Sequence, residues 1–130
     1  MGFSVSTDDR LTIVDVTDRV RERVPNDCES GLCTVFVEHT TAGLVVQENE
    51  PRLRCDLESF LRDLVPDEGH AHDEIDDNAD SHLRAAMVGP SVTVPVRDGE
   101  FAIGTWQSIL VVEFDGPRTR RLSVTTVDGG

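Results

Sequence analysis

Lysine and tyrosine are absent from the sequence, and other aromatic residues are few. All 12 basic residues are therefore arginines, against 25 aspartates and glutamates, and the formal net charge is −13. Proteins bind nucleic acid and anionic membranes through clustered lysine and arginine. The charge balance therefore argues against both as partners.

An aspartate-rich chain without lysine resembles the proteins of extreme halophiles, and an ordinary acidic bacterial domain is the alternative. The halophilic interpretation predicts that stability depends on salt. Charges are screened over about 3 Å in 1 M salt but over about 30 Å in 10 mM salt.

Long hydrophobic runs are also missing. No apolar stretch approaches the roughly 20 residues that cross a bilayer, and no charged-then-apolar leader opens the chain, so we expect a soluble, cytoplasmic protein. The three cysteines, Cys28, Cys33 and Cys55, form neither an even set nor a C-x-x-C pair. They are expected to be buried fillers or free thiols rather than metal or redox groups.

A chain of 130 residues is the size of one domain, which we place at residues 1–130. Valine recurs in short alternating runs and favours sheet. We predict an α+β fold with about six or seven strands in a mostly antiparallel or mixed sheet, packed with two main helices. The expected strands are residues 11–16, 32–39, 42–47, 90–96, 101–114 with a break at Gly104, and 118–127.

Two segments have helical periodicity. Residues 50–66 place leucines and Phe60 on one face, which we expect to pack on the sheet. Residues 78–89 follow a polar loop, with Gly89 as the stop. The inward side chains of this second helix are predicted to be Ala79, Leu83, Ala86 and Met87.

The run "VFVEHTTAGLVV", residues 35–46, is apolar at both ends and polar in the middle. If a strand ends near His39 and the chain turns through Thr40 and Thr41, His39 stands at the mouth of the sheet, where sites are commonly built. His72 and His82 lie on the loop and helix beyond. Converging neutral imidazoles with nearby carboxylates suit zinc, with water completing the site. Alternatively, each histidine is solvated or hydrogen-bonded singly.

Three segments together resemble the YjbQ family, also labelled secondary thiamine-phosphate synthase: "VEHTTAGLVVQENE", "HDEIDDNADSHLRAAMVGPS" and "VTVPVRDGEFAIGTWQSILVVEFDGPRTRR". The resemblance extends from residue 3 to 127. It implies a small α+β protein that forms a homotrimer, with a histidine-containing metal pocket near the subunit interface and a weak thiamine-phosphate synthase activity.

Individual residues match the family's motifs. Its H-T-T falls on His39, Thr40 and Thr41, and its loop histidine falls on His72. Its N-A-x-x-H falls on Asn78 and His82. The resemblance therefore implies that His39, His72 and His82 bind a divalent metal, zinc in our interpretation, with His70 as a fourth candidate. Thr40, Thr41 and Asn78 are expected at the substrate, although Asn78 can equally cap its helix.

Other candidates have two interpretations each. Glu48 is a general base or ligand, or it stabilises a helix dipole. Gly104 and Thr105 let the backbone approach a substrate, or they mark a bulge. Trp106 is expected in the core or an interface rather than as a stacking platform. Arg118, Arg120 and Arg121 suit phosphate, with Arg118 catalytic and Arg120 substrate-binding, or they pair with carboxylates.

Two functions follow from these assignments. One is a transferase that condenses a hydroxymethylpyrimidine diphosphate with a thiazole phosphate and releases pyrophosphate, with metal and arginines stabilising the departing phosphate. No glycine-rich phosphate cradle precedes a helix here. The alternative is a trimeric metal- or small-ligand-binding protein, or a metal-dependent hydrolase, in which any synthase activity is incidental.

Overall fold

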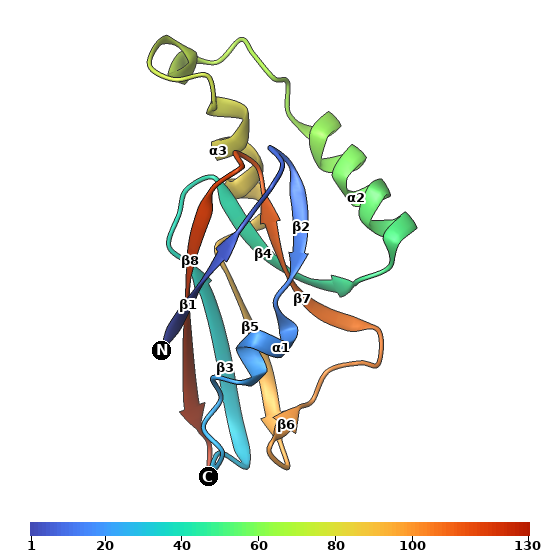
Figure 1. Ribbon diagram of the computed structural model, residues 1–130, viewed down its shortest axis with the longest axis vertical. Helices are drawn as coiled ribbons and strands as arrows, with labels where there is room; N and C mark the ends of the chain where they lie inside the picture. The colour runs from blue at the N-terminus through green and yellow to red at the C-terminus, as the bar shows by residue number, and fades with distance from the viewer.

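The chain folds into eight strands in two antiparallel sheets (Figure 1). The computed structural model describes residues 1–130. Sheet A has the order β1 (Gly2–Ser6), β8 (Thr119–Asp128), β3 (Ser30–Val37), β5 (Ser91–Arg97) and β6 (Glu100–Phe101). Sheet B has the order β2 (Thr12–Asp15), β7 (Gln107–Glu113) and β4 (Ala42–Glu48). The α+β class is confirmed, but the strands form two sheets rather than one.

Burial along β7 shows how the layers stack. Ile109 and Val111 pack with sheet A, whereas Leu110 and Val112 pack with Leu61 and Ala85 of the helices. Side chains alternate across a strand, so β7 is covered on both faces. Sheet B therefore lies between sheet A and a helical layer.

The polar interruptions in the sequence are the points where the chain changes sheets. β3 ends at Val37 in sheet A, residues 38–41 bend, and β4 begins in sheet B. The predicted single strand 101–114 divides in the same way, because β6 belongs to sheet A and β7 to sheet B. The strand end near His39 is thus confirmed, and the predicted strand that Gly104 breaks is corrected to two strands in different sheets.

The helices are α1 (Thr17–Arg21), α2 (Pro51–Leu64) and α3 (Ala79–Val88), with a 3-10 turn at Ala71–Glu74. Glu50 caps α2 by accepting a hydrogen bond from the Leu53 N–H at 2.7 Å. The apolar stripe of α2 is buried only at Leu61, and the Phe60 side chain is 61% exposed. The expected packing of the whole stripe is therefore wrong, because α2 leans away from sheet B along much of its length (Figure 1).

The buried face of α3 is also not the predicted one. Leu83 and Met87 are exposed, whereas Asp80 and Arg84 are buried with Ala79, Ser81 and Ala85. The C-terminal end of α3 reaches β4 at Gly43, where an added Cβ would lie 2.7 Å from the Val88 side chain. Periodicity assumes that charges face water, but Asp80 and Arg84 pair with each other at 2.5 Å.

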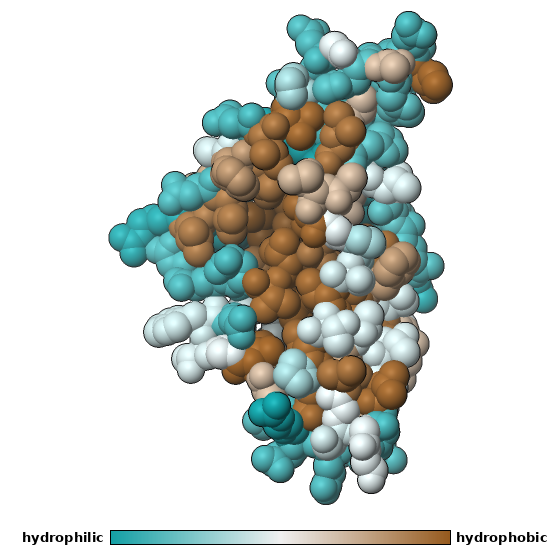
Figure 2. All heavy atoms as spheres, turned by 180° about the vertical axis from the view of Figure 1, so that it is seen from behind, coloured by the Kyte–Doolittle hydropathy of each residue, from teal (hydrophilic) through white to brown (hydrophobic).

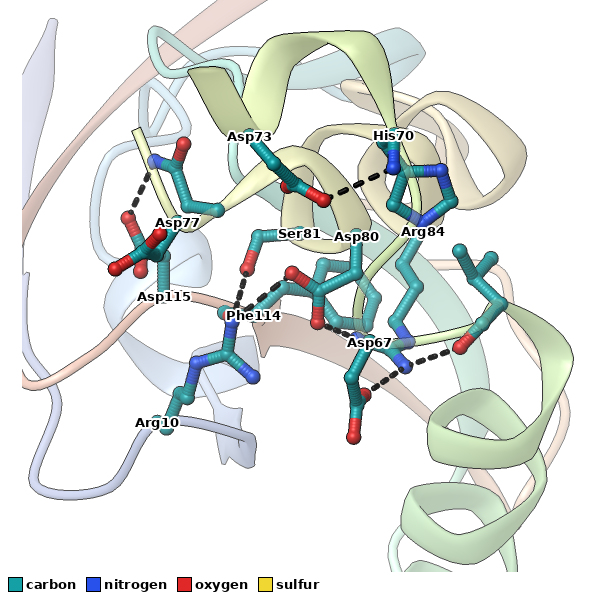
Figure 3. Close-up of polar contacts among 12 residues, drawn as sticks. Arg10, Asp67, His70, Asp73, Asp77, Asp80, Ser81, Arg84, Phe114 and Asp115 are labelled. Carbon is teal, nitrogen blue, oxygen red and sulfur yellow. Dashed lines mark hydrogen bonds and ion pairs between the residues drawn. The ribbon is translucent and has the colours of Figure 1, made fainter. Parts of the chain in front are cut away.

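Arg84 joins α3 to the end of α2 (Figure 3). Its guanidinium donates at 2.7 Å to three carbonyl oxygens, those of Leu61, Arg62 and Val65. These groups belong to the last turn of α2, where carbonyls lack helical partners. Asp80 also accepts from Arg10 at 3.0 Å. Burial alone would raise the pKa of Asp80, but the hydrogen bonds from Arg10 and Arg84 lower it.

Candidate functional site

A cavity of about 580 Å³ lies where β3 passes into β4, beside α3 and the β7–β8 turn, and no hydrophobic side chain lines it. Its lining includes seven of the predicted site residues: His39, Thr40, Thr41, Asn78, His82, Arg118 and Arg120. The three chain segments that carry them are distant in sequence, and the crossing between sheets brings them together.

His39 lies directly after β3, and the backbone N–H of Arg121 donates to its Nε2 at 2.9 Å. Burial lowers the pKa of His39, and the positive charge of Arg120 lowers it further against the opposing effect of Glu113. The ring is therefore neutral at pH 7. Because Nε2 accepts, the proton of the neutral ring is on Nδ1, which makes that nitrogen a hydrogen-bond donor.

Arg120 and Glu113 form a buried ion pair beneath the cavity, with exposed side-chain fractions of 2% and 0%. Arg120 donates from Nε to Glu113 Oε1 at 2.8 Å and from Nη2 to Thr41 Oγ1 at 2.8 Å. Thr7 also donates to Glu113 Oε1 at 2.7 Å. Burial alone would raise the pKa of Glu113, but these donors lower it. Arg120 Nη1 has no hydrogen-bond partner in the chain, and Arg120 lines the cavity.

Four side chains form a hydrogen-bonded row that begins in the cavity and ends at His72, which lines a neighbouring pocket together with His82. Arg118 Nη2 donates to Asp115 Oδ2 at 2.9 Å, and Asn78 Nδ2 donates to the same oxygen at 2.9 Å. Asn78 Oδ1 lies 3.1 Å from His72 Nε2. The amide of Asn78 thus contacts a histidine and an acid, and the structure shows no side-chain cap from it to α3.

The rings of His72 and His82 meet edge to face, with centroids 4.9 Å apart. His82 lines the polar cavity together with His39. Both also line an adjoining cavity of about 640 Å³, whose other walls include Phe36, Ala42 and Ala85. The site thus has a polar half and a more apolar half that meet at the histidines.

The histidines offer a partial donor set for a divalent ion. The ring nitrogens of His82 and the Nδ1 of His72 have no hydrogen-bond partner in the chain, and free imidazole nitrogens suit a borderline ion such as zinc. His39 keeps Nε2 on the Arg121 N–H. No three histidine, cysteine, aspartate or glutamate side chains gather so that they could hold a metal ion. Two of the three predicted ligands therefore fit in this arrangement.

Three predicted residues lie away from the cavity. Glu48 pairs with Gln107 at one end of β4 and β7, whereas Ala42 pairs with Glu113 at the other. Six residue steps at about 3.3 Å separate Glu48 from the cavity end of the strand by roughly 20 Å. Gly104 and Thr105 precede Gln107 at the same far end. The structure does not bring these three to the histidines of their own chain.

The structure also locates two further candidates, His70 and Trp106. His70 Nε2 lies 2.7 Å from the Pro66 carbonyl oxygen, and His70 caps the 3-10 turn. Trp106 is 73% exposed, so the expectation of a core position is wrong. An interface position stays a prediction.

Sequence reasoning missed the acids Glu113 and Asp115. The chain has 25 acidic residues, so a single one carries little signal. One clue was present, because Glu113 is the only charge in the apolar run "ILVVEF" at residues 109–114. A charge inside a buried strand requires a partner, and that partner is Arg120.

Two stacked antiparallel sheets with a histidine- and arginine-lined cavity define a small α+β protein with a polar cleft. The chain belongs to the UPF0047 YjbQ-like family, whose model matches residues 1–129. A UPF0047 protein from Archaeoglobus fulgidus is 47% identical over 125 residues, which cover 95% of this chain and 98% of the relative. The predicted family is thus confirmed.

Solved structures agree with this assignment. A hypothetical protein from Aeropyrum pernix K1 is 41% identical, with a TM-score of 0.93 over 98% of this chain and 96% of that one. A YbjQ-like protein of unknown function from Sulfolobus solfataricus is 37% identical, with a TM-score of 0.89 over 95% and 92%. None of the helices here combines the length and apolar character that crossing a bilayer requires. Family membership establishes the fold, and the function must be argued from the site.

Proposed function

We propose that the cavity is the active site of an enzyme that acts on a small phosphorylated substrate. The observation that carries the proposal is the lining itself: on a chain of net charge −13, one cavity without hydrophobic side chains joins two histidines to Arg118 and Arg120. Anions are repelled from most of such a surface. A cavity with unpaired guanidinium nitrogens is the place where a phosphate is tolerated.

The side chains of the cavity have different roles in this proposal. Arg118 and Arg120 keep Nη1 free of partners in the chain and donate to phosphate oxygens. The acids paired with them, Asp115 and Glu113, hold the guanidinium groups in place. His39 stays neutral and donates from Nδ1 to an oxygen on which negative charge develops.

A divalent ion, which the family resemblance implies, would be held by His72 and His82. When bound, it would neutralise phosphate charge and polarise a phosphoryl oxygen. Metal analysis of the purified protein tests this assignment. We expect His72→Ala and His82→Ala to lose zinc, and His70→Ala, whose ring contacts the Pro66 carbonyl, to keep it. Equal zinc content in all three variants would contradict the proposed ligands.

The reaction we favour is the condensation of a hydroxymethylpyrimidine diphosphate with a thiazole phosphate, which releases pyrophosphate. The two adjoining cavities support it, because a ring can occupy the more apolar half while its phosphate lies in the polar half. Metal-dependent hydrolysis is the second candidate, because imidazoles around a bound ion suit it equally well.

An assay of both reactions separates these candidates. Both substrates are supplied in high salt, with and without a chelator, and thiamine phosphate, pyrophosphate and orthophosphate are measured. Formation of thiamine phosphate with an equal amount of pyrophosphate supports the synthase, whereas orthophosphate without thiamine phosphate supports hydrolysis. A rate equal to the blank for all three products would reject both reactions.

Phosphate binding is tested separately with inorganic pyrophosphate by calorimetry. We expect Arg118→Gln to weaken binding by about tenfold, the effect of losing one charge-assisted hydrogen bond. Arg97→Gln removes the same charge from the exposed end of β5 and serves as the control. If the two variants bind pyrophosphate equally well, the proposed phosphate site is wrong.

We further propose that copies of the chain associate as the homotrimer that the family resemblance implies. Figure 2 shows apolar and small uncharged side chains gathered along the middle of one face, with charged ones around them. Exposed apolar residues include Leu32, Phe36 and Val127 of sheet A. Monomers rarely leave large apolar patches exposed. Light scattering in high salt should give three times the chain mass, and a monomer would contradict the proposal.

A further inference from the structure

Asp115 lines the polar cavity and lies between the side chains of Arg118 and Asn78. Its side chain is 15% exposed, and its Oδ2 accepts from both Arg118 and Asn78. Its backbone N–H donates to Glu113 Oε2 at 2.9 Å, which fixes its position above the buried ion pair. Arg118 also donates from Nε to the Asp115 carbonyl oxygen at 2.8 Å.

The chemistry of this acid determines the orientation of the next side chain. A carboxylate paired with a guanidinium is only an acceptor, so Asn78 must turn its NH₂ group toward Asp115. The Oδ1 of Asn78 then faces His72. Asn78 is 9% exposed, so water offers little compensation for the opposite orientation.

The orientation of Asn78 in turn selects the tautomer of His72. An amide oxygen only accepts, so the contact at 3.1 Å requires a proton on His72 Nε2. In the neutral form of the ring the lone pair is then on Nδ1, and the same ring meets that of His82 edge to face. We infer that Asp115 is a positioning residue that, through Asn78, holds His72 with Nδ1 free to bind a metal ion or accept a proton.

This inference deepens the proposed site, and its metal readout rests on the proposed function. Nitrogen-15 NMR of histidine-labelled protein reports the tautomer directly and needs no ligand. We expect His72 to be the Nε2–H tautomer in the native protein. In Asp115→Asn, an amide at position 115 can donate or accept, so Asn78 can turn over and the Nδ1–H form of His72 should appear.

The control is Asp8→Asn, which makes the same change at an exposed acid and should leave the His72 spectrum unchanged. A native His72 in the Nδ1–H form, or the same spectrum in Asp115→Asn as in the native protein, would overturn the inference. If Asp115→Asn fails to fold, Asn78→Ala is used instead, because it removes the amide and should release the tautomer in the same way.

Zinc affinity gives a second readout. Losing an outer partner of a ligating histidine typically costs about 10- to 100-fold in metal affinity, and we expect that loss in Asp115→Asn but not in Asp8→Asn. If the tautomer changes while neither the native protein nor the variant binds zinc, the positioning role stands and the metal part of the proposed function fails.

Discussion

Two buried arginine–carboxylate pairs occupy different regions of the molecule. Arg84 with Asp80 lies between α2 and α3, and Arg120 with Glu113 lies beneath the cavity. In each pair the arginine side chain is 2% exposed and the acid 0%. Arg84 commits Nε, Nη1 and Nη2 to partners within the chain, whereas Arg120 leaves Nη1 unpaired at the cavity.

A buried arginine–carboxylate pair can therefore either join two structural elements or present a charge to a cavity. Burying two charges is costly, and the pair recovers that cost only with complete hydrogen bonding. In the Arg84–Asp80 pair, groups of the chain itself supply the remaining hydrogen bonds. In the Arg120–Glu113 pair, Arg120 Nη1 lacks a partner in the chain. This is the arrangement expected where a ligand supplies the missing hydrogen-bond acceptor.

The largest expected effect is that of Arg84→Met. It leaves Asp80 buried with only Arg10 as its partner and removes the donors to the end of α2. We expect the free energy of unfolding to fall by about 3–5 kcal/mol, measured by urea denaturation. The variant should bind pyrophosphate like the native protein. Loss of binding in the folded variant would break the distinction between the two pairs.

Glu113→Gln should change pyrophosphate binding more clearly, and stability less, than Arg84→Met does. The amide still accepts from Arg120 but without its charge, so we expect a loss of about 2 kcal/mol in the free energy of unfolding. The uncompensated Arg120 should bind pyrophosphate several-fold more tightly, as measured by calorimetry. The pKa of His39 should also fall further, because Glu113 raises it in the native protein. Unchanged affinity would argue that Arg120 only supports the fold.

Acid should weaken both pairs. The pKa values of Glu113 and Asp80 are lowered by folding, so the unfolded chain takes up protons at higher pH than the folded one does. Their contribution to stability is complete above about pH 5, where these carboxyls are ionised in the unfolded chain as well, and is lost as the pH falls through the lowered folded values. Urea denaturation at a series of pH values should show a shallower decline for Glu113→Gln and for Asp80→Asn than for the native protein. Parallel curves would contradict the assignment.

The smallest effect is expected at Asp67, an exposed acid that contacts Arg84. Asp67 lies 3.1 Å from Arg84 Nη2, but its side chain is 73% exposed. Asp67→Asn should lower the free energy of unfolding by about 0.5 kcal/mol in dilute buffer. In 1 M KCl, where screening acts over about 3 Å, the difference should disappear. A loss near that of Arg84→Met would show that the exposed contact, not the buried pair, joins the helices.

Several parts of the fold and site could be predicted because their signals are local. Alternation marked the strands, and Pro51 and Gly89 marked helix ends. The polar interruption after Val37 placed His39 at a strand end, where the structure has it. The match of short motifs to a family then singled out five residues that line one cavity, and the cluster of arginines near the C-terminal end added Arg118 and Arg120.

Other parts could not be predicted, since they depend on which strands are neighbours. Glu48 appears close to His39 in the sequence, but β4 carries it to the far end of sheet B. Leu83 and Met87 fit an apolar stripe, yet the charged pair of Asp80 and Arg84 is buried instead. An analysis of hydrophobic periodicity places charged residues at the surface, because it holds no information about an oppositely charged partner in a different element.

Local sequence patterns were enough to establish the α+β class, the main strands and helices and the residue types at the site, because alternation, helical period and turn chemistry depend on neighbouring residues. The two-sheet arrangement and the partners of the buried charges became visible only in the folded chain. Thr7 bonds Glu113 across 106 positions, and Arg120 bonds Thr41 across 79. Such contacts are set by strand order, and the desolvation of a charge makes them necessary once the strands have packed.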